Sequence, residues 1–230
     1  MDSETKVTYG IIGGLIILLI GLAYILQGGG VSTEEITQEK IPTNTPKKAT
    51  QAEQTPPQTI ISTSSPMENK QYTQAVITTN RGVIEIEFDK SKQLTVGNFG
   101  KLAESSFYNG VRFHRVIQGF MIQTGDPLSK DTVNKSAWGT GGPGYKFQDE
   151  LVGNEQYTTG IVAMANSGPN TNGSQFFIVT AQPGVGLPPS YTVFGRVTKG
   201  LDVALAIEKE KTNSSDQPLE DIMIEKVEVK

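Results

Sequence analysis

The residue best suited to chemistry is Arg115, which directly follows His114, the single histidine of the chain. An arginine keeps its charge and presents several N–H donors in a planar fork. It can therefore stabilise a developing lone pair without giving up a proton. The chain has no cysteine, which excludes thiolate nucleophiles, disulfides and cysteine-ligated zinc. One histidine cannot form a clustered-histidine metal site, so we expect neither a metal nor a cofactor.

The overall composition favours a protein of strands and turns that binds no nucleic acid. The 230 residues include 25 glycines, and glycine weakens helix interiors while serving tight turns. The formal net charge is −4, whereas binding of nucleic-acid phosphates needs a basic patch.

An apolar run from Val7 to Leu26 predicts a membrane anchor. A helix needs about 20 apolar residues to cross the hydrocarbon of a bilayer, and this run just reaches that length. A cleaved signal peptide is the alternative, although Tyr24-Ile25-Leu26-Gln27 makes a poor small-x-small cleavage site; a buried core helix is the third reading. We assign residues 1–27 to an N-terminal tail and single-pass transmembrane anchor of the cell membrane.

Two further regions follow the anchor. Residues 28–70 are rich in Thr, Gln, Ser, Pro and Glu and hold few large apolar side chains. Such a stretch buries too little surface to offset its ordering entropy, so we expect a disordered linker. Residues 71–230 are expected to form the folded domain. A short N-terminus before the apolar run and a large domain after it favour a domain outside the cytoplasm.

The pattern of residues 71–230 predicts a mainly β domain. Two alternating runs flank the turn Asn80-Arg81-Gly82 and predict a hairpin. Helical spacing predicts one helix from Leu94 to about Ser105 and another from Gly200 to Glu208. Further strands are expected at 111–117, 121–124, 161–165, 175–180, 191–197 and 222–229. Together these favour a closed eight-stranded antiparallel β-barrel capped by two α-helices and preceded by one transmembrane helix.

Two segments are long and specific enough to indicate a family. They run from Phe113 to Asp126, FHRVIQGFMIQTGD, and from Met164 to Ile178, MANSGPNTNGSQFFI. Both closely resemble the signature segments of cyclophilins. Gly139–Gly142 and Thr192–Val197 resemble two more, in the order of the family. The resemblance covers about residues 71 to 230.

The resemblance implies an enzyme, a peptidyl-prolyl cis/trans isomerase that accelerates rotation about X–Pro bonds of proline-containing polypeptides. It assigns Arg115 as the catalytic residue. It also implies two groups of substrate-binding residues. The proline pocket would consist of Phe120, Met121, Phe177 and Leu187. The substrate backbone would be held by Gln123, Ala165, Asn166 and Gln175.

These residue types suit the reaction. The barrier to rotation is about 18–20 kcal/mol because the nitrogen lone pair is delocalised into the carbonyl. No bond breaks, so neither a nucleophile nor a metal is required. A fixed donor aimed at the nitrogen of the twisted amide binds the transition state better than either planar ground state. An apolar pocket can hold the prolyl ring while polar groups hold the flanking backbone.

Strand periodicity gives independent expectations for the faces of these residues. His114 and Arg115 should point to opposite sides, which makes His114 a hydrogen-bonded structural residue rather than a general base. Met121 and Gln123 should share a face. Phe113 and Phe176 are expected in the core.

The sequence departs from the family pattern before Thr192. Where the family commonly has Trp-Leu-Asp-Gly-Lys-His, this chain has Gly186-Leu187-Pro188-Pro189-Ser190-Tyr191. Tyr191 stands at the histidine position and still offers substrate an apolar face and one hydroxyl. Gly186 stands at the tryptophan position, and that tryptophan favours cyclosporin binding in the family. We therefore expect weak cyclosporin binding. Residues 127–138, with the only tryptophan, resemble an insertion.

Three functions remain compatible with the sequence. The first is an active isomerase that assists the folding of exported or surface proteins. The second is a proline-binding or chaperone module with little turnover, and Arg115 favours the first over it. The third is a hydrolase built around His114, for which no nucleophile motif is present.

Overall fold

The structure is a computed structural model that describes residues 70–230. The expected anchor at 1–27 and all but the last residue of the expected linker at 28–70 lie outside the described residues. Between residues 70 and 230 no helix combines the length and the apolar character that a membrane crossing requires.

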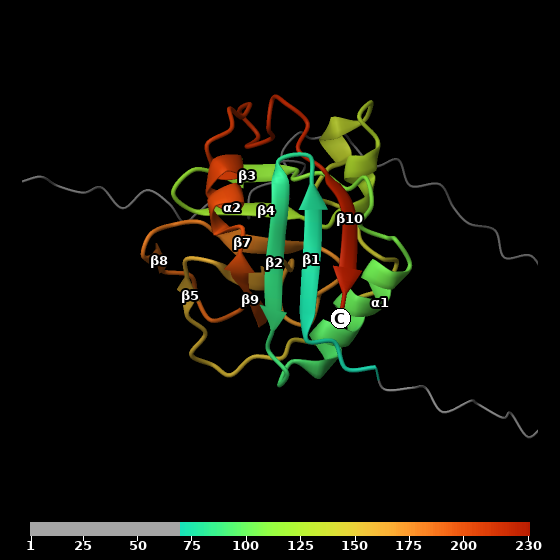
Figure 1. Cartoon of the computed structure of the whole chain (residues 1–230), viewed down its shortest axis with the longest axis vertical. Coiled ribbons are helices and arrows are strands. Elements are labelled where there is room, and N and C mark those ends of the chain that lie inside the picture. The colour runs from blue at the N-terminus through green and yellow to red at the C-terminus, as the bar shows by residue number, and fades with distance from the viewer. Residues whose placement is uncertain (1–69) are drawn as a thin grey trace, which may run out of the picture. The chain divides into compact units, whose positions relative to one another are not determined.

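Eight strands form one antiparallel sheet in the order β10-β1-β2-β9-β6-β7-β4-β3. The strands are β1 (Gln74–Thr79), β2 (Gly82–Phe88), β3 (Arg115–Ile117), β4 (Met121–Thr124), β6 (Ile161–Met164), β7 (Phe176–Val179), β9 (Val193–Lys199) and β10 (Ile224–Val229). A separate pair joins β5 (Tyr157–Thr158) and β8 (Gly184–Val185). In Figure 1, β10, β1 and β2 stand side by side at the front, and β3, β4 and β7 cross behind them.

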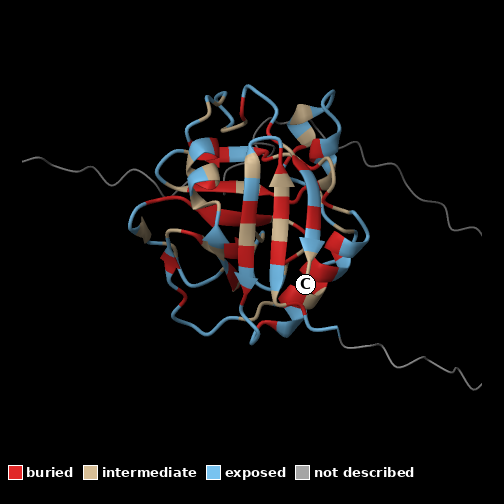
Figure 2. Cartoon of the chain, in the orientation of Figure 1, coloured by how far each residue is buried: buried red, intermediate tan, exposed pale blue. Residues whose placement is uncertain are grey.

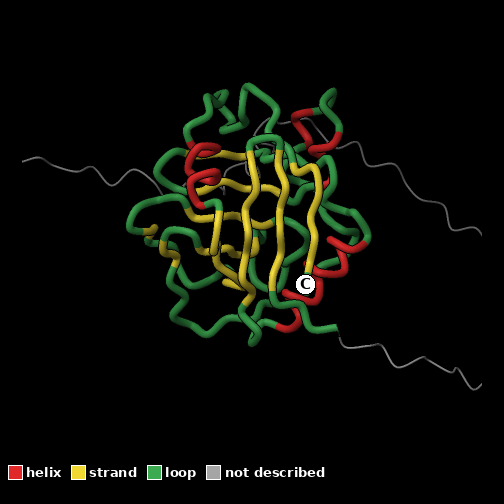
Figure 3. The backbone as a smooth tube through the Cα atoms, viewed as in Figure 1, coloured by secondary structure: helices red, strands yellow, loops and turns green. Residues whose placement is uncertain are grey.

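Two helices and two short 3-10 turns complete the described part of the chain. They are α1 (Gln93–Glu104), α2 (Leu201–Glu208), η1 (Pro127–Lys130) and η2 (Lys135–Ala137). Both helices lie where the sequence predicts them. Much of the remaining chain is loop, as Figure 3 shows.

The sheet curls into a half-barrel with two helices, and no continuous ladder joins its edge strands β3 and β10 as the expected fully closed barrel would require. The segment before β3 is nevertheless bonded to the start of β10. The N–H groups of Gly110 and Phe113 donate to the carbonyls of Ile224 and Ile222 at 2.8 and 2.9 Å, beside an isolated bridge between Arg112 and Met223. The backbone N–H of Val116 in β3 donates instead to the carbonyl of Asp216 at 2.8 Å. The loop between α2 and β10 thus occupies the edge of β3 that a closing strand would need.

The alternation of side chains along the strands produces two separate apolar clusters. The larger one fills the inside of the curl and includes Phe99, Phe113 and Phe176, each at most 1 % exposed. Its rings pack edge-to-face and stacked, as between Phe99 and Phe176 with centroids 5.4 Å apart. Phe113 and Phe176 therefore lie in the core, as the sequence predicts. Figure 2 shows buried residues alternating with intermediate or exposed ones along β1 and β2.

Helix α1 closes the curl with its apolar side and is anchored by a distant residue. Val96, Phe99 and Leu102 are buried at helical spacing. The N–H groups of Leu94 and Thr95 donate to the carboxylate of Glu150, at 3.1 and 2.8 Å. A carboxylate accepts hydrogen bonds from the free N–H groups of the first turn. Its negative charge also interacts favourably with the positive end of the helix dipole.

Candidate active site

The register of the sheet places Arg115 on the same face as the residues predicted to bind substrate. Arg115 in β3 lies opposite Gln123 in β4, Gln123 lies opposite Phe177 in β7, and Phe177 lies opposite Ala163 in β6. Residues directly opposite one another in antiparallel strands project from the same face. This row therefore faces outward from the curl, whereas the neighbouring Val116 and Ile122 point into the main core.

The second apolar cluster lies on this outer face. Met121 and Phe177 are 2 % and 5 % exposed, and the partly buried side chains of Phe120, Leu187 and Tyr191 pack against the same cluster. The structure thus gathers all four residues predicted for the proline pocket, together with Tyr191. That they bind a prolyl ring stays a prediction.

The ring of Tyr191 has a well-defined place in this cluster. It meets Phe177 edge-to-face, with centroids 5.6 Å apart. Its backbone N–H donates to the hydroxyl of Tyr157 at 3.0 Å, and that hydroxyl donates to the Tyr191 carbonyl at 3.0 Å. Burial raises the pKa of Tyr157, so the hydroxyl keeps its proton and can donate. Sequence analysis missed Tyr157, because its position in β5 gives no local signal of contact with residue 191.

A pocket of about 600 Å³ adjoins this row at Gln123. Gln123, Ala165, Asn166 and Gln175, the four residues predicted to hold the substrate backbone, all line it. The structure therefore brings together this predicted group as well. The pocket is otherwise built from the glycine-rich loop after the insertion and from the loop after β6; these include Gly139, Gly141, Pro143, Tyr145, Ser167 and Thr171.

Hydrogen bonds fix the two glutamines of this pocket. The Nε2 group of Gln123 donates to Oε1 of Gln175 at 3.0 Å. The Nε2 group of Gln175 donates in turn to the carbonyls of Gly139 and Gly141, at 3.0 and 2.9 Å. The backbone N–H of Ala165 donates to the Gln175 carbonyl at 2.9 Å. Gln175 is thus held in one orientation by groups from three separate segments.

Asn166 is held from the opposite side of the pocket. Its Nδ2 group donates to the carbonyl of Ser190 at 2.8 Å, and its Oδ1 accepts the N–H of Gly168 at 3.3 Å. The first of these bonds connects the loop after β6 to the segment 186–191, where the sequence departs from the family pattern.

A fully buried carboxylate supports the glycine-rich loop. Asp126 is 0 % exposed, and its side chain accepts the N–H groups of Leu128, Gly139 and Gly141. The loop approaches so closely that a Cβ at Gly141 would lie 2.1 Å from Asp126 Oδ1. Asp126 therefore joins the two ends of the segment 127–138. It also positions Gly139 and Gly141, whose carbonyls accept hydrogen bonds from Gln175.

His114 is buried next to the glycine-rich loop, where a Cβ at Gly139 would lie 3.5 Å from its ring. It is 4 % exposed, and burial lowers its pKa to about 4, so the ring is neutral at pH 7. Among residues 70–230, neither ring nitrogen has a partner in hydrogen-bond geometry. This burial agrees with the predicted structural role of His114, whereas the hydrogen bond predicted for its ring is not formed. Without a hydroxyl bonded to this ring, the hydrolase reading lacks its base–nucleophile pair.

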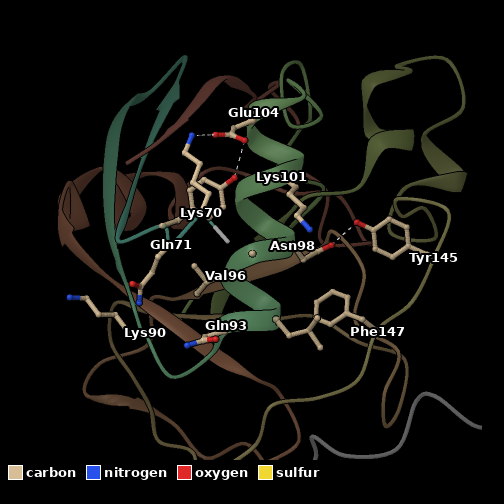
Figure 4. A pocket seen from close by; sticks show the side chains of 13 residues that line it. Lys70, Gln71, Lys90, Gln93, Val96, Asn98, Lys101, Glu104, Tyr145 and Phe147 are labelled. Carbon is tan, nitrogen blue, oxygen red and sulfur yellow. Dashed lines mark hydrogen bonds and ion pairs between the residues drawn. The ribbon is translucent and has the colours of Figure 1, made fainter. Parts of the chain in front are cut away.

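A larger pocket of about 850 Å³ runs along α1 (Figure 4). Its lining includes Lys70, Lys90 and Lys101, and it shares only Tyr145 with the pocket beside Gln175. The Tyr145 hydroxyl donates to Asn98 Oδ1 at 2.6 Å. None of the predicted site residues lines this pocket.

Comparison with known proteins gives a consistent result. A family model described as "Cyclophilin type peptidyl-prolyl cis-trans isomerase/CLD" matches residues 74–229. Peptidyl-prolyl cis-trans isomerase-like 1 of Homo sapiens is 40 % identical over 161 residues, which cover 69 % of this chain and 93 % of that protein. Peptidyl-prolyl cis-trans isomerase CYP71 of Arabidopsis thaliana is 48 % identical over 137 residues, which cover 59 % of this chain but only 21 % of that longer protein.

Solved structures agree in fold. A cyclophilin type peptidyl-prolyl cis-trans isomerase of Cryptosporidium parvum superposes with a TM-score of 0.61 at 32 % identity, covering 69 % of this chain and 98 % of that one. A second structure of the same protein, determined in the presence of the dipeptide Ala-Pro, gives a TM-score of 0.60 over 68 % of this chain and 98 % of that one.

Proposed function

This chain belongs to the cyclophilin-type peptidyl-prolyl cis-trans isomerase family, and we propose that Arg115 is the residue that catalyses rotation about the X–Pro bond. One observation carries the proposal. The row Arg115–Gln123–Phe177 puts a permanent cation and an apolar cluster on the same outer face of the sheet.

We call the second apolar cluster and the pocket beside Gln175 together the groove. The proposed mechanism assigns a separate task to each of these two parts. The prolyl ring enters the cluster around Met121 and Phe177, where burial of its apolar surface holds it. The residues flanking the proline lie against the pocket beside Gln175, which holds the substrate backbone. One side of the X–Pro bond is then fixed while the other turns.

Arg115 acts on the bond itself. As the amide twists, its nitrogen becomes pyramidal and regains a localised lone pair, and a guanidinium N–H donates to it. This contact is absent in the planar cis and trans forms, so it lowers the barrier without tightening either ground state. At 44 % exposure, the Arg115 side chain is accessible to a bound peptide.

The substitution Arg115→Ala tests the assignment. Loss of one preorganised donor to a transition state costs about 100- to 1000-fold in rate. We expect a loss of this order in a protease-coupled assay with a proline-containing peptide. Arg196→Ala is the matched control, because Arg196 lies in β9 and pairs with Glu87 away from the groove. Equal rates for wild type and Arg115→Ala would eliminate the assignment and leave a proline-binding module.

The apolar run before the domain supports a proposal for the location of the enzyme. We propose a membrane-tethered isomerase that acts on exported or surface proteins, with Val7–Leu26 as its anchor. Protease added to intact cells should then remove the domain at 71–230, and a cytoplasmic antigen serves as the control. Full protection of that domain until the cells are lysed would place it in the cytoplasm and reject this proposal.

Weak cyclosporin binding is the remaining proposal for this groove. Gly186 stands where the family commonly has a tryptophan, so an apolar side chain that could contact the drug is missing. We expect inhibition of peptide isomerisation only at concentrations far above those needed for a cyclophilin with the tryptophan. Gly186→Trp should strengthen inhibition. Equally tight inhibition of the wild-type chain would refute the reasoning.

A further inference from the structure

The loop between α2 and β10, residues 209–223, brings a second charge to Arg115. The Oδ2 atom of Asp216 lies 3.6 Å from Nε of Arg115, and both side chains are 44 % exposed. The two residues are 101 positions apart in the sequence, so only the fold makes them neighbours.

The backbone that carries Asp216 is fixed independently of this ion pair. Its carbonyl accepts the N–H of Val116 at 2.8 Å, and its own N–H donates to the carbonyl of Asn213 at 3.1 Å. The side chain of Asn213 accepts the N–H groups of Ser215 and Gln217 at 2.9 and 3.1 Å. Gln217 also donates to the carbonyl of Lys135 in the insertion, at 2.9 Å. The carboxylate is therefore presented from a braced loop.

The geometry of the contact leaves the reactive end of Arg115 available. A guanidinium has five N–H groups, one on Nε and four on the two terminal nitrogens. The carboxylate of Asp216 engages the Nε side. The four terminal N–H groups remain for the substrate, and the charge attraction at 3.6 Å, longer than a hydrogen bond, favours side-chain conformations that keep Nε beside Asp216. Such restraint lowers the entropy that is lost when the donor meets the transition state.

We propose that Asp216 is a positioning residue for Arg115, and that its carboxylate holds the guanidinium by Nε in the orientation used for catalysis. This inference rests on the proposed function of Arg115. It predicts that loss of the Asp216 charge lowers kcat and leaves KM almost unchanged, because the arginine contact forms in the transition state.

Asp216→Asn is the informative substitution. Asp216 has a φ of 59°, a conformation that asparagine also tolerates, so the backbone bonds of the loop are kept. The matched control is Glu220→Gln, which removes the same charge from the same loop but affects a carboxylate that pairs with Arg81. Exposed ion pairs contribute about 0.2–1 kcal/mol, which converts to a change of roughly 1.4- to five-fold.

The experiment measures kcat and KM of full-length wild type, Asp216→Asn and Glu220→Gln, each also in the Arg115→Ala background. We expect kcat of Asp216→Asn to fall about two- to five-fold with KM within about two-fold, and Glu220→Gln to match wild type. In the Arg115→Ala background Asp216→Asn should have no further effect. The NMR resonance of the Arg115 Nε–H group should shift in Asp216→Asn and stay in place in Glu220→Gln.

The possible outcomes separate this inference from the proposed function. If Arg115→Ala is inactive while Asp216→Asn has the wild-type kcat, Asp216 forms only a surface ion pair and the inference is overturned. An equal loss of kcat with and without Arg115 overturns it too, since the effect would then bypass the guanidinium. If Arg115→Ala retains the wild-type rate, the proposed function itself fails.

Discussion

The substitution Asp126→Asn should destabilise the domain and disturb the groove together. The Asp126 carboxylate is 0 % exposed and accepts three backbone N–H groups. Its Oδ1 accepts the N–H of Leu128 at 2.8 Å. Its Oδ2 accepts the N–H of Gly139 and, at 3.1 Å, that of Gly141. An amide in the same place has one acceptor oxygen, so its NH₂ group must face one or two of these donors.

The magnitude follows from the number of bonds lost. A hydrogen bond to a charged group contributes about 1.5–3 kcal/mol, and a buried donor left without a partner costs a similar amount. The asparagine can rotate to keep either the Leu128 contact or the two glycine contacts. It therefore loses one or two of the three, and we expect the free energy of unfolding to fall by about 3 kcal/mol. Activity should fall as well, because the Gly139 and Gly141 carbonyls orient Gln175.

Urea unfolding followed by fluorescence measures this effect with a built-in probe. Trp138 is the only tryptophan, is 8 % exposed and directly precedes Gly139. The matched control is Asp131→Asn in the same insertion. Its side chain accepts only the N–H of Val133 in exposed surroundings, while its backbone carbonyl still receives the Trp138 indole N–H at 2.8 Å. The free energy of unfolding of Asp131→Asn should lie within about 0.5 kcal/mol of the wild-type value. The same result for Asp126→Asn would refute the proposed support of the loop.

Two further predictions concern backbone conformation and pH. In urea unfolding, Gly142→Ala should leave the free energy of unfolding nearly unchanged. Gly110→Ala should lower it by about 1–2 kcal/mol, because Gly110 has a φ of +80° although an added Cβ would meet no other atom. Gly125→Ala should cost more than either, since its φ is +91° and a Cβ would lie 2.3 Å from the Ser174 carbonyl; equal losses at 110 and 125 would contradict this. His114 has a folded pKa of about 4 against 6.5 in the unfolded chain, so the unfolded state binds the extra proton between these values. As the pH falls from 7 to 4, the free energy of unfolding of wild type should therefore fall by about 3 kcal/mol more than that of His114→Gln. Parallel curves of unfolding free energy against pH would show that the ring has the same pKa in the folded and unfolded states.

Elements with a strong local pattern could be predicted from the sequence. The hairpin of β1 and β2 follows from two alternating runs around a turn, and its strands lie at Gln74–Thr79 and Gly82–Phe88. Helix α1 follows from apolar residues at helical spacing and ends within about one residue of the predicted point. The strand predicted at 111–117 is shorter, Arg115–Ile117. Arg112 forms only an isolated bridge to Met223, and its N–H donates to the Ser129 side chain at 2.9 Å.

Contacts between distant segments could not be predicted in this way. The two-residue strands β5 and β8 carry too few residues for a periodic signal, yet they place Tyr157 beside Tyr191. Glu150 caps α1 from 55 or more residues away. The edge of β3 is likewise completed by a distant segment, since the Val116 N–H donates to the Asp216 carbonyl at 2.8 Å.

The sequence by itself predicted which residues gather at the site, because two long motifs contain Arg115, Met121, Gln123 and Phe177, and the period of two puts Met121 and Gln123 on one face of their strand. Only the tertiary structure decided how those residues are held. The register between β3, β4 and β7 aligns them in a row, the buried Asp126 fixes the loop around Gln175, and Asp216 meets Arg115 across 101 positions. Periodicity is a property of neighbouring residues, whereas ion pairs and caps between distant segments depend on how the whole chain folds.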